Sequence, residues 1–489
     1  MAPPRCATVF VFISFLATIQ ATDFHVSCQT NQDCANLINK FYVCQENVCQ
    51  NNQMLDFSKE TIFGLALIVV ISAIANAGGI GGGAILSALY ILWFKFSIGD
   101  AIPLSNATIF SGALMNFFVI VNKRQDKNKN RLLIDYKLAS LILPLMLGGA
   151  LVGVIVNKVL PPIFIVGFLT YYLVTKTISF YKDAKEVTEK ENMEKELEKY
   201  NKANPITRPS RKIVENKLAE LSSFTPRNSI ENVAKDRRLN MSTPEELLLS
   251  KRENDKLGLL DLLAPYRRYI LLCLVTYTVI LIAMLLRGGK AFPSIIGIGS
   301  CSFASWLIFI IAQGVLVVLA WFSFRSQEQE SIEPSIPMMD NLSLDYSQSR
   351  DHMRNFMFDS FKAGVISGTL GLGGGMILMP MLITKNFLPA IASAVCGVLV
   401  LITSFSTTSQ FLIMGAFDIK STMIVVICSG IGSYFGSQLI SYAVEKYEKP
   451  SLIMWVVFAV LLLSAIILPY VGVLNIIQNP KIFNFSSPC

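Results

Sequence analysis

Histidine is almost missing from this chain, and its long apolar stretches offer no clear Asp, Glu or His inside the membrane. The 489 residues include two histidines, His25 and His352, and both lie outside those stretches. Intramembrane proton relays are usually built from Asp, Glu or His, so the sequence identifies no such relay. No Gly-Lys-Ser/Thr triplet follows a glycine cluster, and no apolar stretch carries a His-rich metal motif. We therefore expect no enzymatic activity, no metal and no cofactor.

Charged residues are also scarce, at 16%, whereas hydrophobic residues make up 53% of the chain. The mean hydropathy is +0.51. A helix needs roughly 20 apolar residues to span a bilayer. The net charge of +8 does not indicate nucleic-acid binding, because basic residues flank membrane helices anyway. The sequence predicts an all-α polytopic membrane protein with about ten membrane segments, at 61–94, 102–122, 134–157, 161–181, 268–287, 298–324, 359–384, 388–414, 419–441 and 452–474.

The amino terminus is typical of a secretory signal peptide. Residues 1–21 contain Arg5, a short apolar run and Ala21 at the end. A first membrane helix is the alternative, but the apolar run is short for a span. The signal indicates an integral membrane protein of the secretory pathway or plasma membrane.

Four cysteines follow within a short polar segment, 22–57. Cys28, Cys34, Cys44 and Cys49 predict two disulfides in a luminal or extracellular module, although their pairing cannot be read from the spacing. A zinc site is the competing interpretation, but the usual close Cys pairs are missing.

Charge sets the expected orientation. The loop 123–131 is strongly basic and is predicted to be cytosolic. A cytosolic loop 123–131 agrees with an external amino terminus only if the run 61–94 crosses the membrane twice or dips into it and returns. Successive segments that cross in alternating directions then place the tail 476–489 on the luminal or extracellular side.

The predicted segments divide into two membrane repeats with linkers between them. The first half, 58–181, and the second, 358–475, would then enter from opposite sides, as inverted-topology repeats do. A single long helix over 61–94 would contradict this. Between the halves we expect a cytosolic helical or disordered linker at 182–267, a membrane helix pair at 268–324 and a cytosolic linker at 325–357. The linker 182–267 is expected to be a tether, with a cytosolic partner as the alternative.

Each half carries a dense glycine cluster inside an apolar run. The first reads GGIGGG over 78–83, and the second reads GLGGG over 371–375. Glycine is costly inside a helix, so paired clusters predict deliberately broken helices. In lipid, broken backbone is tolerated where it is buried in protein or lines a cavity. Paired interruptions are the best sequence indication of a transporter's substrate site.

The second cluster resembles a family signature. The stretch GLGGGMILMP over 371–380 is similar to that of the sulfite exporter TauE/SafE family, a glycine-rich turn followed five residues on by proline. The first copy has Ala88 where the proline would stand. The resemblance covers roughly 58–181 and 359–474. It implies a membrane exporter of sulfite, sulfonates or related organic anions that works without a nucleotide-binding domain.

A broken helix can bind an anion, because the next half-helix begins with free N–H groups and a partial positive charge. Hydroxyl and amide groups nearby could complete the site. The alternatives are that the glycines only allow close packing and that the hydroxyls bond to their own helices. The predicted substrate-binding residues are Asn76, Gly79, Gly81, Gly82, Gly83, Asn106, Thr108, Gly371, Gly373, Gly374, Gly375, Pro380, Thr403 and Thr407.

These observations predict a transporter of small anions that works by alternating access around two glycine-rich breaks. Its partners would be the anionic substrate and the lipid bilayer. A membrane receptor or scaffold with a disulfide module and no transport activity is the second hypothesis. Substrate-dependent flux in vesicles distinguishes the two.

Overall fold

A computed structural model describes most of the membrane part of the chain. The described residues are 42–45, 48–51, 58–94, 96, 98–124, 132–203, 263–288, 294–299, 302–332, 350–370, 373–385, 387–413, 419–447 and 449–478. The predicted signal peptide 1–21, Cys28, Cys34, Gly371 and the tail 479–489 lie outside these residues.

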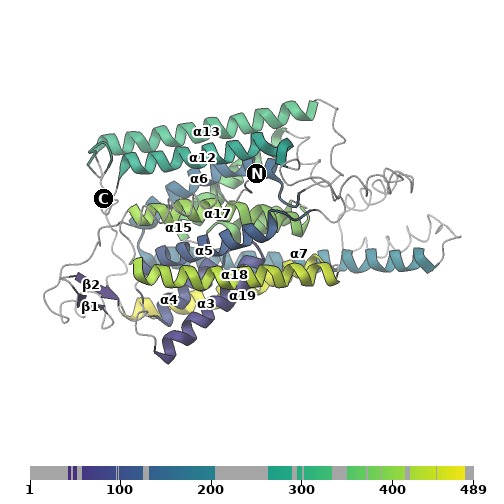
Figure 1. Cartoon of the computed structure of the whole chain (residues 1–489), viewed down its shortest axis with the longest axis horizontal. Helices are drawn as coiled ribbons and strands as arrows, with labels where there is room; N and C mark the ends of the chain where they lie inside the picture. Colours follow the sequence, from purple (N-terminus) through teal and green to yellow (C-terminus); the bar gives the residue numbers. More distant parts are fainter. Residues whose placement is uncertain are drawn as a thin grey trace, which may run out of the picture.

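The described chain is almost entirely helical (Figure 1). A two-stranded antiparallel hairpin, β1 (Tyr42–Gln45) and β2 (Val48–Asn51), precedes the helices. The main helices are α3 (Lys59–Ala77), α4 (Gly83–Leu92), α5 (Ile98–Ile120), α6 (Tyr136–Val159), α7 (Pro162–Ala203), α12 (Arg267–Arg287), α13 (Phe303–Ile332), α15 (Arg350–Leu370), α16 (Gly375–Thr384), α17 (Pro389–Ile413), α18 (Ile419–Tyr447) and α19 (Ser451–Gln478).

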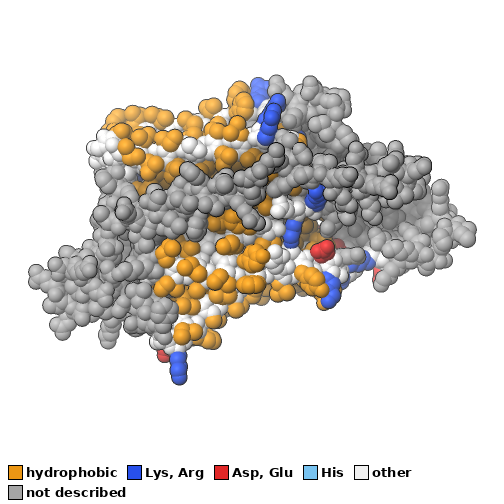
Figure 2. Space-filling model, viewed as in Figure 1, with side chains coloured by type: hydrophobic (Ala, Val, Ile, Leu, Met, Phe, Trp, Pro, Cys, Tyr) orange, Lys and Arg blue, Asp and Glu red, His pale blue; other side chains and the backbone are white. Residues whose placement is uncertain are grey.

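The helices form one bundle whose surface suits a bilayer. Seven of them are long and apolar enough to cross a membrane, and α4, α16 and part of α19 are shorter apolar helices. Figure 2 shows hydrophobic side chains over the middle of the visible face, with most visible basic and acidic side chains toward the edges of the described part. The predicted all-α polytopic membrane fold is confirmed.

The run 61–94 folds as a long helix followed by a short one that turns back. The indole Nε1 of Trp93, just after α4, donates to the carbonyl oxygen of Glu60 in the first turn of α3, at 2.9 Å. The rings of Phe63 and Trp93 lie 5.3 Å apart. At 1.5 Å per residue, the ten residues of α4 rise about 15 Å, roughly half of a hydrocarbon core. The run therefore dips in and returns instead of making two full passes.

Close helix pairs join the two halves of the sequence. Helix α6 packs on α15 with Met146 beside Gly364 and Ala150 beside Gly368, so residue numbers rise together and the helices are parallel. A Cβ at either glycine would clash with backbone of α6. Small residues allow this approach, as is common in membrane bundles.

Helices α3 and α18 form a second parallel pair, because Val69 lies beside Gly432 and Ala73 beside Gly436. By contrast, α5 and α17 are antiparallel. Thr407 contacts Asn106 early in α5, whereas Gly397, earlier in α17, lies against Asn116 near the end of α5.

Two parts lie outside this core. The pair α12 and α13 packs on the side of α6, as Figure 1 shows at the top of the view. Helix α7 continues without interruption to Ala203, and its carboxy-terminal end projects beyond the bundle (Figure 1).

Candidate functional site where two broken helices meet

The first helix break lies between α3 and α4. Gly79, Gly81 and Gly82 have φ values of 73°, 79° and 68°, in the left-handed region that glycine adopts without penalty. Gly82 is the residue that precedes α4. Any side chain at these three positions would be strained, which explains why the turn needs glycine.

The second break, between α15 and α16, has the same construction. Gly373 and Gly374 have φ values of 68° and 81°, and Gly374 precedes α16 as Gly82 precedes α4. Helices α4 and α16 each contain ten residues, although α16 carries Pro380 and α4 has Ala88 at the corresponding place. The missing proline therefore does not change the length of the short helix.

The two breaks meet in space. A Cβ at Gly375 would lie 2.7 Å from the carbonyl oxygen of Gly79. Ile109 of α5 lies between the breaks, because its Cγ2 would be 2.7 Å from a Cβ at Gly81 and 3.0 Å from one at Gly373. The predicted glycines of both halves thus form one buried centre, except that Gly371 is outside the described residues.

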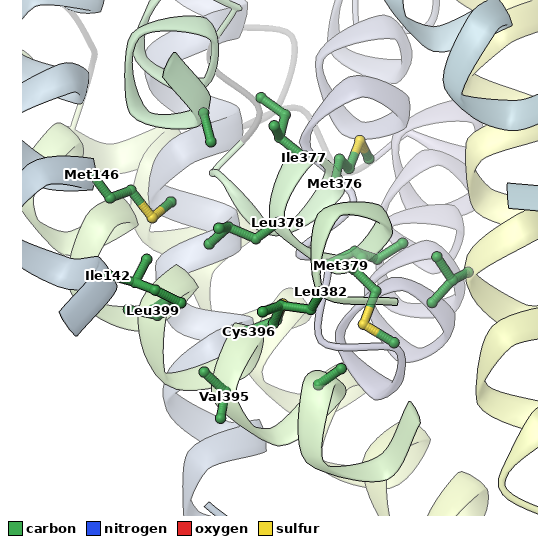
Figure 3. Close-up of a cluster of buried hydrophobic side chains, with 14 of the residues drawn as sticks. Ile142, Met146, Met376, Ile377, Leu378, Met379, Leu382, Val395, Cys396 and Leu399 are labelled. Carbon is green, nitrogen blue, oxygen red and sulfur yellow. The ribbon is translucent and has the colours of Figure 1, made fainter. Parts of the chain in front are cut away.

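Side chains fill the space beside these glycines. Val400 of α17 lies against both Gly81 and Gly375, and a Cβ at Gly374 would clash with the Cε of Met146. Figure 3 shows Met146 among the apolar side chains beside α16, together with Leu378. Close packing, the alternative considered for the glycines, is therefore one of their roles.

The amide groups at the start of each short helix remain without acceptors. Backbone bonding resumes at Ile85, whose N–H donates to the carbonyl oxygen of Gly82, and at Ile377, which donates to that of Gly374, both at 3.1 Å. Within the described part of the chain, no acceptor faces the N–H groups of residues 83–84 or 375–376. These groups carry the partial positive charge of a helix amino terminus.

Three predicted polar residues take part in hydrogen bonds between the halves. The Nδ2 of Asn76 donates to Ser433 Oγ at 2.9 Å and to the carbonyl oxygen of Ser72 at 3.1 Å. The Oγ1 of Thr407 donates to Asn106 Oδ1 at 3.1 Å. The Asn76–Ser433 and Thr407–Asn106 bonds lie in the protein interior and join helices of different halves, whereas the bond to Ser72 stays within α3.

Other predicted residues are bonded locally or lie further from the breaks. Thr108 forms a 2.6 Å hydrogen bond with Tyr90 of α4. Thr403 Oγ1 donates to the carbonyl oxygen of Gly373 at 3.2 Å and to that of Leu399 at 2.8 Å. Pro380 is buried in the middle of α16, away from the glycine turn.

The interior of the bundle holds no buried charge among the described residues. Its buried polar side chains are all Ser, Thr or Asn. The same residues contain no cluster of three His, Cys, Asp or Glu side chains that could hold a metal ion. A ligand at the breaks would therefore meet amides and hydroxyls instead of ionised groups.

Comparison with known proteins agrees with this architecture. The sequence model of the family "Sulfite exporter TauE/SafE" matches residues 8–179 and 357–481 of this chain. The chain belongs to the sulfite exporter TauE/SafE family. The match starts at residue 8 instead of near residue 58, where the glycine-motif resemblance began, so it includes the cysteine-bearing segment. This is a family of membrane transporters, and the chain is a multi-pass integral membrane protein.

Several relatives come from Arabidopsis thaliana. Sulfite exporter TauE/SafE family protein 2 is 26% identical over 452 residues, which cover 90% of each chain. Sulfite exporter TauE/SafE family protein 6 is 23% identical over 491 residues, covering 99% of this chain and 100% of the relative. No solved structure matches the chain.

The sequence did not single out several residues that form this centre. Ile109, Val400 and Met146 are ordinary apolar residues in apolar runs, and no pattern distinguishes them. Ser433 and Ser367 could have been noticed as hydroxyls within apolar stretches, but such residues are common there.

Proposed function

We propose that this protein transports a small anion, such as sulfite, a sulfonate or a related organic acid, across a membrane. Membership of the TauE/SafE family supports transport, and its relatives are named as sulfite exporter family proteins. The substrate-binding part of the proposal rests on the two glycine breaks.

One observation carries the proposal: the two glycine breaks meet in an interior that, among the described residues, has no buried charge and no acceptor for the N–H groups that open each short helix. Each terminus contributes a partial positive charge and amide donors, which can bind an oxyanion without a dedicated cation. Because no full positive charge is involved, the anion is not held as tightly as in a salt bridge, which suits a carrier that must release it.

We further propose that the two halves are inverted repeats that support alternating access. In each half a broken helix is followed by one long helix, α5 or α17, and these two equivalent helices are antiparallel. The parallel pairs α3 with α18 and α6 with α15 agree with the same relationship. Repeats of opposite orientation around a central site are typical of alternating-access transporters.

The orientation follows from charge. The basic loop 123–131 would be cytosolic, and so would 182–267, which serves as a tether or as a docking segment for a cytosolic partner. The segment 22–57, with its cysteines in disulfides, would face the lumen or exterior, which indicates the secretory pathway or plasma membrane.

The decisive experiment is flux of radiolabelled anions through purified protein in liposomes. The panel contains sulfite, sulfate, methanesulfonate, taurine and small carboxylates, with empty liposomes as the control. We expect saturable flux of at least one sulfur oxyanion or organic acid. No protein-dependent flux of any member would contradict the proposal and favour the receptor or scaffold hypothesis.

A further inference from the structure

We propose that the anion binds at the second break, with the Ser367 hydroxyl as a direct contact, and that the first break is structural. This inference rests on the proposed transport function and assigns unequal roles to the two halves. It follows from a difference between corresponding positions of the breaks.

The two turns are alike in backbone but not in what lies beside them. Seven residues before Gly82 stands Ala75, and its Cβ would be 2.5 Å from a Cβ at Gly82. Seven residues before Gly374 stands Ser367, whose Oγ would be 3.4 Å from a Cβ at Gly374. The place taken by a methyl group in the first half thus holds a hydroxyl in the second.

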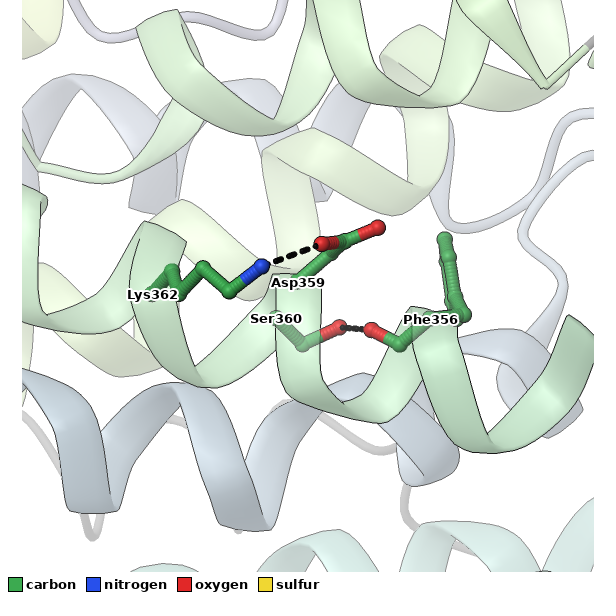
Figure 4. Close-up of polar contacts among 4 residues, drawn as sticks. All are labelled: Phe356, Asp359, Ser360 and Lys362. Atoms are coloured by element: carbon green, nitrogen blue, oxygen red, sulfur yellow. Dashed lines mark hydrogen bonds and ion pairs between the residues drawn. The ribbon is translucent and has the colours of Figure 1, made fainter.

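The Ser367 side chain is buried, and its hydroxyl makes no hydrogen bond with the described residues. Ser367 is 3% exposed, and nothing in the described part of the chain accepts from or donates to its Oγ. Two other hydroxyls of α15 are bonded to their own helix: Ser360 to the carbonyl oxygen of Phe356 and Thr369 to that of Val365, both at 2.8 Å. Figure 4 shows the bond of Ser360. The Ser367 hydroxyl therefore keeps its hydrogen-bonding capacity available for a ligand beside Gly374.

The hydroxyl adjoins the amino terminus of α16, a helix of ten residues. The N–H groups of Gly375 and Met376 have no acceptor in the described chain, so hydroxyl and amides form a set of donors. A sulfite or sulfonate group presents three oxygens and can accept several such bonds at once. The shared chemistry is that of a compact oxyanion.

Met146 covers this place in the structure. Its Cε lies where a side chain at Gly374 would begin, and the residue is fully buried. Methionine has three rotatable bonds and adapts its shape readily. We infer that the Met146 thioether moves aside when the anion enters, whereas Ala75 at the first break has no side chain that could move.

The test measures anion flux against concentration for wild type and three variants in liposomes. Ser367→Ala removes the proposed contact. Ser360→Ala removes a self-bonded hydroxyl from the same helix, and Ala75→Ser adds a hydroxyl at the first break. We expect Ser367→Ala to raise KM by about ten-fold or more with little change in maximal rate, because a hydrogen bond to a charged ligand is lost. The other two variants should stay within about two-fold of wild type.

The outcomes distinguish a failure of this inference from a failure of the proposed transport function. Normal KM in Ser367→Ala, with active wild type, would overturn the second-break site and leave anion transport standing. An equal rise of KM in Ser360→Ala would also overturn it, because the effect would then belong to α15 in general. No flux in wild type would remove both proposals. Each variant is first compared with wild type for yield and thermal stability.

Discussion

Gly375 at the start of α16 lies directly against Gly79 of the first break, so that a Cβ at Gly375 would be 2.7 Å from the Gly79 carbonyl oxygen. These residues are almost three hundred positions apart. Gly79 is part of the first turn and Gly375 follows the second, and both turns contain glycines with positive φ. The contact couples the start of α16 to the first turn, because neither can move far without displacing the other. Substitutions at either turn should therefore affect the whole centre.

The first prediction concerns the glycines that precede the short helices. Gly82→Val and Gly374→Val place a branched side chain on left-handed backbone and against Ala75 or Met146. Strain of this kind costs of order 1–3 kcal/mol, so we expect anion flux to fall by about ten-fold or more.

Gly314→Val is the matched control, because a Cβ at Gly314 of α13 meets nothing within 4 Å. It should transport normally. Flux is measured per molecule of reconstituted protein, and only variants that reach the membrane in normal amount are compared. Wild-type flux in both Gly82→Val and Gly374→Val would remove the glycine breaks from the mechanism.

Sequence reasoning identified the breaks and the membrane fold but not their partners. Glycines 79, 81, 82, 373 and 374 were recognisable because positive φ is a local backbone demand that shows in composition. Hydropathy could not decide whether 61–94 crosses twice, since length alone fits both; the Trp93–Glu60 hydrogen bond decides it. Ile109, Val400 and Met146 could not be predicted, because tertiary packing between distant segments selects them.

The second prediction tests the side of the membrane reached by the α3–α4 hairpin. Single cysteines replacing Glu60 and Asp100 should react with an impermeant maleimide from the same side, because α4 returns to the start of α3. A cysteine replacing Lys123 should react from the opposite side, since α5 crosses in between. Native cysteines are replaced beforehand. Labelling of positions 60 and 100 from opposite sides would contradict the hairpin and the inverted repeats.

The third prediction is energetic coupling across the contact of α5 with α17. Thr407 donates to Asn106 at 3.1 Å, so Asn106→Ala and Thr407→Ala remove the same hydrogen bond. In a double-mutant cycle of stability we expect a coupling of roughly 0.5–1.5 kcal/mol. Thr408→Ala is the control partner, because the buried Thr408 hydroxyl has no hydrogen bond within the described residues. Additive effects of Asn106→Ala and Thr407→Ala would show that the contact is incidental.

The fourth prediction concerns the cysteine segment 22–57. Antiparallel pairing of β1 with β2 places Cys44 directly opposite Cys49, while Cys28 and Cys34 lie outside the described residues. If the segment is external, alkylation after reduction should modify about four more cysteines than alkylation before it. Mass spectrometry of digests without reduction would then identify the pairing among the three possible ones. Four cysteines that react without reductant would contradict both the disulfides and the external location.

The last prediction concerns the part of α7 that contacts the turn between α18 and α19. Glu191 Oε1 accepts from the backbone N–H of Ser451, the first residue of α19, at 2.8 Å. Lys195 Nζ donates to the carbonyl oxygen of Tyr447 at the end of α18, at 2.7 Å. A carboxylate at a helix amino terminus is stabilising, and removing such a cap typically costs about 1 kcal/mol.

Glu191→Ala should therefore loosen the turn and expose it to protease. Trypsin cleaves after lysine unless proline follows, so Lys446 at the end of α18 is a cleavage site, whereas Lys449, which precedes Pro450, is not. We expect cleavage after Lys446 to become several-fold faster in detergent-solubilised protein, because about 1 kcal/mol corresponds to roughly a five-fold change in the population of the opened turn. Glu189→Ala is the matched control, because Glu189 is exposed and pairs with Lys185 of its own helix at 3.8 Å. Equal cleavage rates in the two variants would mean that the Glu191 contact does not hold the turn, and the packing of Tyr181 against Trp455 and Phe458 would then be what keeps α7 on α19.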